Sequence, residues 1–165
     1  MTVRQAIGTG FEGVFVPLPE DGTGAAALGE EWLHQWRDAR VREMLEHLGP
    51  PAWMPRSSSK SESISSPHQL AQEFAAKRFT ELDIGEQRVV LLMRALVAKP
   101  PVVLLDEVWS AMSEEMVLAA RRYLRGLDHD QAVVVITHWE DEVPWSIAEG
   151  LKIFRLEEGK GEVVA

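Results

Sequence analysis

Two carboxylates and one histidine stand where apolar runs end. Asp106 and Glu107 directly follow the run VVLL at residues 102–105, and His138 follows the run VVVIT at 133–137. Such runs are typical of strands covered on both faces in a parallel sheet. Because α/β proteins bind ligands at the carboxyl ends of parallel strands, these three residues are candidates for a functional site.

Adjacent acids at a strand end suit phosphoryl transfer. One carboxylate can hold Mg²⁺ through its water shell while the next orients or deprotonates the attacking water. The alternative is purely structural, because acids are also favoured where a strand runs into a helix N-terminus. The acids alone leave both interpretations open, so the neighbouring segments have to decide between them.

The neighbouring segments follow a characteristic order. The segment LDIGEQR at 82–88 precedes an apolar helical run at 89–97, the acidic strand, the segment SAMS at 110–113 and the strand that ends in His138. In this order the chain resembles the second, C-terminal half of an ATP-binding cassette (ABC) ATPase domain, with its signature loop, Walker B strand, D-loop and switch histidine. Within that family, GEQR at 85–88 and the DEVP segment after His138 resemble stand-alone cassettes of the molybdate-import and photorepair type.

The resemblance implies a role for each strand-end residue. Asp106 would order the water shell of Mg²⁺, and Glu107 would polarise the attacking water. His138 would contact the γ-phosphate and that water from the opposite side. ATP and Mg²⁺ are therefore the implied cofactors, with Asp106 as the metal residue and Glu107 and His138 as the catalytic residues.

The signature segment supplies the implied nucleotide-binding residues Asp83, Gly85, Glu86 and Gln87. In this family two cassettes meet head to tail, and each signature loop caps the ATP held by the other. Asp83 and Ile84 replace the usual serine and glycine, and a carboxylate there would repel a phosphate by about 4 kcal/mol at 4 Å. Asp83 and Glu86 also form a capping-box pattern, which explains these residues without any ligand.

The chain lacks a recognisable phosphate-binding loop. No Gly-x-x-x-x-Gly-Lys-Ser/Thr motif occurs, and neither GTG segment, at 8–10 or 22–24, is followed by a lysine. Such a loop supplies the backbone N–H groups and the ammonium that hold nucleotide phosphates. We therefore expect a partial cassette, unable to hold nucleotide alone, whose partner is another ABC cassette or the missing N-terminal half.

Composition limits the other partners. The net charge of −9 argues against a nucleic-acid surface, and Arg94 interrupts the longest apolar stretch, so no membrane span is expected. The absence of cysteine is compatible with a reducing compartment, either the cytoplasm or an organellar matrix. A chain of 165 residues can bury one core.

The expected fold class is α/β, a partial P-loop NTPase fold with a parallel sheet, a helical subdomain and a C-terminal β-hairpin. Residues 1–56 would form an N-terminal strand, at 2–8, and the helical subdomain. The serine-rich residues 57–66 would be a disordered insertion. Residues 67–165 would carry the signature helix, Walker B strand, D-loop and H-loop.

Periodicity and capping residues predict the individual elements. Helices are expected at 25–48, 67–77, 86–98 and, capped by Ser113, from 114 to about 127. A strand at 132–137 and a terminal hairpin at 151–156 and 162–164 would follow. The tryptophans are expected to be packing groups.

Three classes of function remain open on the sequence alone. An ABC-type ATPase in partial form explains the acids best. A noncatalytic module that docks on an intact cassette is favoured by Asp83 and by Ser113, which stands where an acid is usual. A small structural domain whose acids only cap helices is the third.

Overall fold

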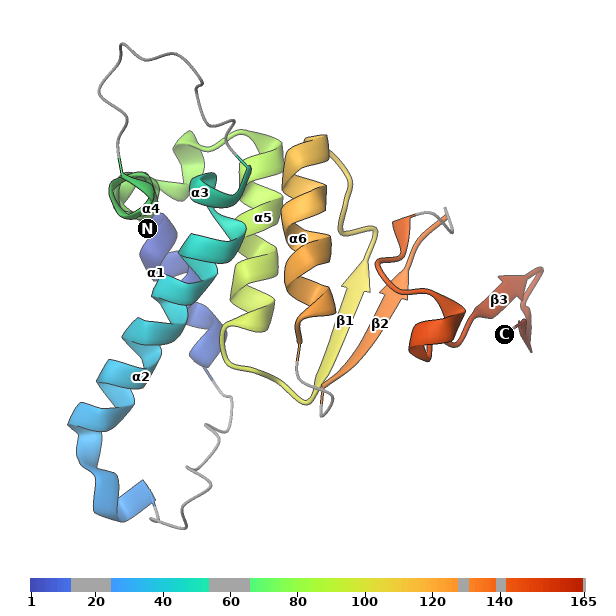
Figure 1. Ribbon diagram of the computed structural model, residues 1–165, viewed down its shortest axis with the longest axis horizontal. Helices are drawn as coiled ribbons and strands as arrows, with labels where there is room; N and C mark the ends of the chain where they lie inside the picture. Colours follow the sequence, from blue (N-terminus) through green and yellow to red (C-terminus); the bar gives the residue numbers. More distant parts are fainter. Residues whose placement is uncertain (13–24, 54–65, 128–130, 139–141, 165) are drawn as a thin grey trace.

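The computed structural model describes residues 1–12, 25–53, 66–127, 131–138 and 142–164. Helices gather beside a two-stranded parallel sheet, and an antiparallel hairpin projects at the far end (Figure 1). The α-helices are α1 (Val3–Gly8), α2 (Ala25–Leu48), α3 (Pro50–Trp53), α4 (Pro67–Ala76), α5 (Ile84–Leu96) and α6 (Glu114–Arg125). The 3₁₀ turns are η1 (Thr9–Phe11), η2 (Phe79–Glu81) and η4 (Ile147–Glu149). The strands are β1 (Val102–Asp106), β2 (Ala132–Ile136), β3 (Phe154–Glu157) and β4 (Lys160–Val163).

The parallel pair forms as predicted. β1 pairs with β2 from Val102 opposite Ala132 to Asp106 opposite Ile136, and α6 connects the two strands. Parallel strands need such a crossover, since a tight turn can join only antiparallel ones. The carboxyl ends of both strands therefore meet at one edge.

The prediction that both faces of these strands are covered is wrong. Val103 and Leu105 are buried, whereas Val102 and Leu104 between them are exposed, as are Val134 and Ile136 of β2. Side chains alternate between the two faces of a strand, so one whole face is open. Among the described residues, the helices bury only the opposite face.

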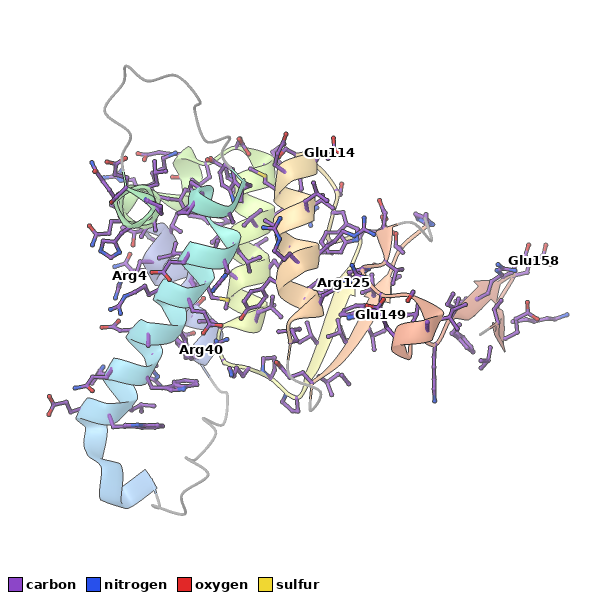
Figure 2. All side chains as sticks on the ribbon, viewed as in Figure 1. Arg4, Arg40, Glu114, Arg125, Glu149 and Glu158 are labelled. Atoms are coloured by element: carbon purple, nitrogen blue, oxygen red, sulfur yellow. The ribbon has the colours of Figure 1, made fainter. Side chains whose placement is uncertain are left out.

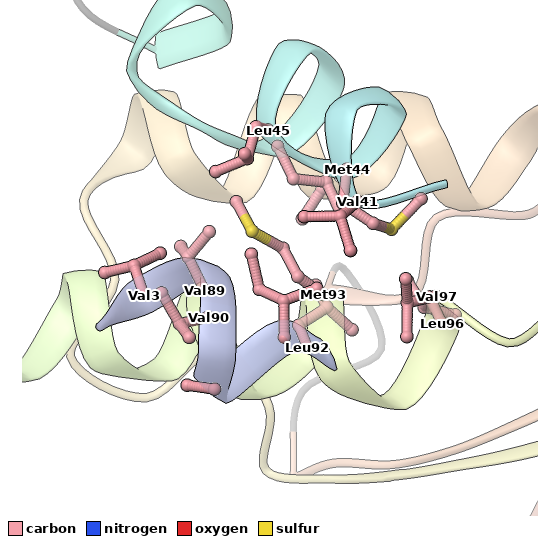
Figure 3. Packing of buried hydrophobic residues seen from close by; sticks show 14 of the residues in the cluster. Val3, Val41, Met44, Leu45, Val89, Val90, Leu92, Met93, Leu96 and Val97 are labelled. Atoms are coloured by element: carbon pink, nitrogen blue, oxygen red, sulfur yellow. The ribbon is translucent and has the colours of Figure 1, made fainter. Parts of the chain in front are cut away.

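The core lies between the helices. Val3 of α1, Met44 of α2 and Val89 and Met93 of α5 are fully or almost fully buried and belong to one apolar cluster (Figure 3). Leu105 extends this cluster to the sheet. The helices and β1 thus share one core, which fixes α5 relative to β1.

The strand predicted at residues 2–8 is a helix. Thr2 caps α1 and forms a reciprocal capping box with Gln5, which closes the first turn. Val3, Ala6 and Ile7 are buried, at spacings that suit a helix rather than an alternating strand. Extended pairing is limited to an isolated bridge between Thr2 and Arg78.

The other elements agree closely with the predictions. α2 covers 25–48, α4 begins with Pro67 after the cap Ser66, and Ser113 caps α6 by accepting from the Met116 N–H. The hairpin β3–β4 forms at the C-terminal end. Most of the serine-rich segment 57–66 lies outside the described residues, so its predicted disorder remains a prediction.

Four of the six tryptophans pack against the core, as predicted: Trp36, Trp53, Trp109 and Trp145. Trp32 stacks on Trp36 with ring centroids 6.4 Å apart. Within the described segments, no helix has the length and apolarity that a membrane crossing requires.

Candidate functional site

The strand ends bring Glu107 and His138 together. The Glu107 backbone N–H donates to the Ile136 carbonyl at 3.0 Å, which extends the β1–β2 pairing by one residue. Across this junction, Glu107 Oε1 lies 3.9 Å from His138 Nε2. The imidazole itself is 85 % exposed, so it can reach a ligand from solvent. A carboxylate and an imidazole thus face each other at the carboxyl edge of the sheet.

Glu107 has an unusual backbone and a half-buried carboxylate. Its φ of 46° lies in the left-handed region, which non-glycine residues seldom adopt and which recurs at functional sites. Oε1 is buried and accepts no hydrogen bond among the described residues, although the side chain as a whole is 44 % exposed. A buried acceptor without a donor costs about 1–3 kcal/mol, so this oxygen is ready to accept from a bound water.

Asp106 offers an exposed carboxylate beside Glu107, at the last position of β1. No group of three or more acids, histidines or cysteines able to hold a metal occurs in the described part of the chain. Mg²⁺ nevertheless needs only one or two protein carboxylates when substrate phosphates and waters complete its shell. The two acids and the unpartnered Glu107 oxygen fit such an ion when nucleotide accompanies it.

The segment after His138 is tied to α6. The Thr137 hydroxyl donates to the Glu142 carboxylate, and Arg121 Nη2 donates to the Val143 carbonyl at 3.1 Å. Arg125 of α6 pairs with Glu149 at 3.0 Å (Figure 2). The sequence did not indicate these contacts, since the partners lie on separate elements. They hold both flanks of the loop that carries His138.

Glu149 gives this segment a pH-dependent anchor. The Ser146 hydroxyl and backbone N–H donate to its carboxylate at 2.8 and 2.9 Å, and together with Arg125 they lower its pKa to about 2. Because the folded pKa is lowered, the contribution to stability is complete above the ordinary value of 4.5 and is lost as pH falls towards 2.

We therefore expect the Ser146 amide resonance to shift as pH falls below about 4, with a midpoint at the lowered pKa of Glu149, about 2. NMR titration measures it. Glu149→Gln is the matched control and should remove the transition. A midpoint near 4.5 would contradict the anchor.

The predicted signature residues form a helix cap. Asp83 Oδ1 accepts from the Glu86 N–H at 2.7 Å, and Glu86 Oε2 accepts from the Asp83 N–H at 3.2 Å. Glu86 also lies 3.7 Å from Lys77 Nζ, and Gln87 Nε2 donates to the Leu82 carbonyl at 3.0 Å. The capping-box interpretation is confirmed. The side chains of Asp83, Glu86 and Gln87 are thus already partnered within their own chain.

Gly85 packs the start of α5 against the segment 110–113. A Cβ at this position would lie 2.5 Å from the Ala111 carbonyl oxygen. Leu82, Gly85, Ala111 and Ser113 line one shallow hollow where the segments meet. Glycine is therefore required here for backbone packing. Among the described residues, no hydrogen bond or ion pair links this hollow to Glu107 or His138.

The glycine-rich turn near the N-terminus also has a packing role. A Cβ on Gly10 would lie 2.1 Å from the Arg94 carbonyl oxygen of α5. This turn is the 3₁₀ segment η1 against a helix, not a phosphate-binding loop opening one. The second GTG segment, at 22–24, lies outside the described residues.

Comparison with known proteins gives partial matches of one kind. No family model matches the chain. It is 39 % identical over 69 residues to an ABC transporter ATP-binding protein of Schizosaccharomyces pombe, covering 41 % of this chain and 14 % of that protein. It is 35 % identical over 100 residues to the spermidine/putrescine import ATP-binding protein of Roseobacter denitrificans, covering 59 % and 27 %. It is 33 % identical over 98 residues to a sulfate/thiosulfate import ATP-binding protein of Shewanella oneidensis, covering 56 % and 27 %.

These matches support the family resemblance at a coarse level. Part of the chain is homologous to ABC transporter ATP-binding proteins, and the mixed α/β structure with its small parallel sheet is compatible with a partial P-loop NTPase fold. The matched segments cover between 14 % and 27 % of the length of these three relatives.

Proposed function

We propose that this chain carries the catalytic half of an ABC-type ATP-hydrolysing site. The observation that carries the proposal is the pairing of Glu107 with His138 at 3.9 Å across the joined ends of β1 and β2. The partial homology to ABC ATP-binding proteins supports the same class. We place the chain nearest the molybdate-import and photorepair type on the GEQR and DEVP segments alone.

Each residue has a defined task in this proposal. Glu107 accepts a hydrogen bond from the attacking water at its free Oε1, which orients the water and polarises its O–H bond. His138 donates from the opposite side of that water and to the terminal phosphate. Asp106 holds the water shell of Mg²⁺, which supplies charge neutralisation on the phosphates when it is bound.

The chain needs help to hold nucleotide. A phosphate-binding loop is not among its 165 residues, so its own contacts to ATP would be few. We infer that a P-loop segment or an intact cassette, supplied by another part of the assembly, grips the triphosphate while Asp106, Glu107 and His138 act on it. Such an assembly fits a cytoplasmic or organellar-matrix location.

Turnover of ATP tests this directly. The isolated chain is expected to release no phosphate above the level of its Glu107→Gln variant, because the nucleotide is not held. Coexpression with the P-loop half of the Roseobacter denitrificans relative should produce turnover that Glu107→Gln lowers about 100-fold or more. Glu46→Gln, on an exposed side chain of α2, is the matched control for the loss of one carboxylate. Turnover that survives Glu107→Gln would overturn the proposal.

A second function has one specific observation in its favour. Asp83 presents its carboxylate at the start of α5, where a capping phosphate would be repelled, and its Oδ1 already occupies the Glu86 N–H. A noncatalytic module that docks on an intact ABC cassette and changes the ATPase rate of that cassette would tolerate a carboxylate at position 83, because it would not bind the phosphate itself. In that case, adding either the chain or its Glu107→Gln variant would alter the ATP turnover of the intact cassette equally.

A further inference from the structure

The end of β2 has two different faces. Exposure alternates along this strand, with Val133 and Val135 half-buried and the residues between and beside them exposed. The alternation continues past the strand, since Thr137 is half-buried and His138 is exposed. Successive side chains of an extended chain point to opposite faces. Thr137 therefore lies on the face that the helices cover, and the His138 imidazole lies on the open face.

The Thr137 hydroxyl closes a polar clamp on the covered face. It donates to the carboxylate of Glu142, which stands four residues after His138. Arg121 of α6 donates from Nη2 to the carbonyl of Val143, the next residue, at 3.1 Å. We call these two hydrogen bonds the covered-face clamp. They join the end of β2, the segment that follows His138, and α6.

Apolar packing holds the acceptor end of the clamp. Pro144 is buried and Trp145 packs against the core cluster, directly after the clamp residues Glu142 and Val143. Proline fixes its own φ and favours an extended backbone in the residue before it. The Thr137 hydroxyl thus bonds to a partner that the core holds in place, so the bond can fix the end of the strand.

The imidazole of His138 has little packing of its own. It is 85 % exposed, and its Nε2 lies 3.9 Å from Glu107 Oε1. Because so little of the ring is packed, its direction depends on the backbone that carries it. That backbone follows Thr137 directly, so a hydrogen bond that fixes Thr137 also fixes the start of the His138 side chain.

Glu142 is an acid that could compete with Glu107 for this imidazole. Opposite charges 4 Å apart attract each other by about 4 kcal/mol near a protein surface, so a carboxylate free to turn would draw a protonated imidazole towards itself. The Thr137 hydroxyl binds the Glu142 carboxylate on the covered face instead, away from the ring. The clamp therefore leaves Glu107 as the acid that faces His138.

We propose that Thr137 is a positioning residue for His138, because its hydroxyl holds Glu142 on the covered face and thereby directs the imidazole to Glu107. Thr137 acts through His138 and contacts neither the phosphate nor the attacking water. Its effect on ATP turnover rests on the proposed function. The geometry of the imidazole and the carboxylate can be measured without nucleotide.

NMR of the full chain without nucleotide tests this geometry. Glu107→Gln is expected to shift the imidazole Cε1–H resonance of His138, because the ring loses a charged neighbour at 3.9 Å. Thr137→Val keeps a β-branched side chain but removes the hydroxyl, and it should abolish most of this response. Thr137→Ser keeps the hydroxyl and should keep the response. Glu142→Ala opens the clamp from its other side if circular dichroism shows that Thr137→Val is unfolded.

ATP turnover of the coexpressed assembly gives the second measurement. Thr137→Val is expected to lower kcat about 10- to 100-fold with little change in KM, because another segment holds the nucleotide, whereas Thr137→Ser should keep most of kcat. A His138 response to Glu107→Gln that persists in Thr137→Val and in Glu142→Ala would overturn the clamp. An equal loss of kcat in Thr137→Val and Thr137→Ser would also overturn it. Turnover that Glu107→Gln leaves unchanged would overturn the proposed function, and the NMR response would then decide the clamp alone.

Discussion

Replacing Arg40 with methionine is expected to lower the free energy of unfolding by about 3 kcal/mol or more. The Arg40 guanidinium is buried, and it donates to the Val97 carbonyl at 2.9 Å and to the Leu96 carbonyl at 3.3 Å. These carbonyls end α5, where a helix leaves its last acceptors without partners in the helix. A cation there also suits the negative end of the helix dipole.

The same guanidinium organises a second layer of contacts. Arg40 pairs with Glu43, and Tyr123 of α6 donates to the other oxygen of that carboxylate at 3.1 Å. Burial raises the pKa of the Tyr123 hydroxyl, which therefore stays protonated and keeps this bond. Methionine keeps much of the volume but leaves the two α5 carbonyls without their donor. The three helices α2, α5 and α6 lose their common polar link.

Chemical unfolding followed by circular dichroism measures the effect. Arg4→Met is the matched control, since Arg4 pairs with Asp38 at 2.7 Å on the surface (Figure 2). An exposed pair contributes about 0–1 kcal/mol, so the control should change little. An equal loss in the two variants would show that water satisfies the α5 carbonyls when Arg40 is absent.

Much of the fold was predictable because its signals are local. The caps Ser66, Asp83 and Ser113 lie next to the helices they begin, and the hairpin has a glycine-containing turn. The strand ends followed from apolar runs that stop at Asp106 and near His138. Parallel pairing then places those ends together, so the candidate site could be inferred before any geometry was known.

The features that were missed depend on distant partners. Arg40 contacts carbonyls that lie more than fifty residues further along the chain. The pattern of apolar residues in α2 therefore does not indicate that this arginine is buried. The strand predicted at 2–8 is a short segment, and in so short a segment periodicity does not separate a strand from a helix. The Thr2 and Gln5 capping box was the local signal that could have corrected it. The open face of β1 and β2 was also missed, because whether a strand face is covered depends on elements far away in the sequence.

Replacing Gly85 with alanine is expected to lower the free energy of unfolding by about 2 kcal/mol, despite the better helix propensity of alanine. The new Cβ would lie 2.5 Å from the Ala111 carbonyl oxygen, a backbone atom that cannot rotate away. Relief requires α5 or the segment 110–113 to move. Since the Ser110 N–H donates to the Glu107 carbonyl at 3.3 Å, the movement should also shift the Glu107 and His138 resonances in an NMR spectrum.

Gly8→Ala provides the matched control for this prediction. Gly8 has helical dihedrals at the end of α1, and nothing lies within 4 Å of the position its Cβ would take. Alanine there should stabilise the chain by about 0.5–1 kcal/mol through a less flexible unfolded state. Opposite signs in the two variants would show that Gly85 is required for close packing between α5 and the segment 110–113. If Gly85→Ala also stabilises the chain, the segment 110–113 is free to move and is not rigidly joined to α5.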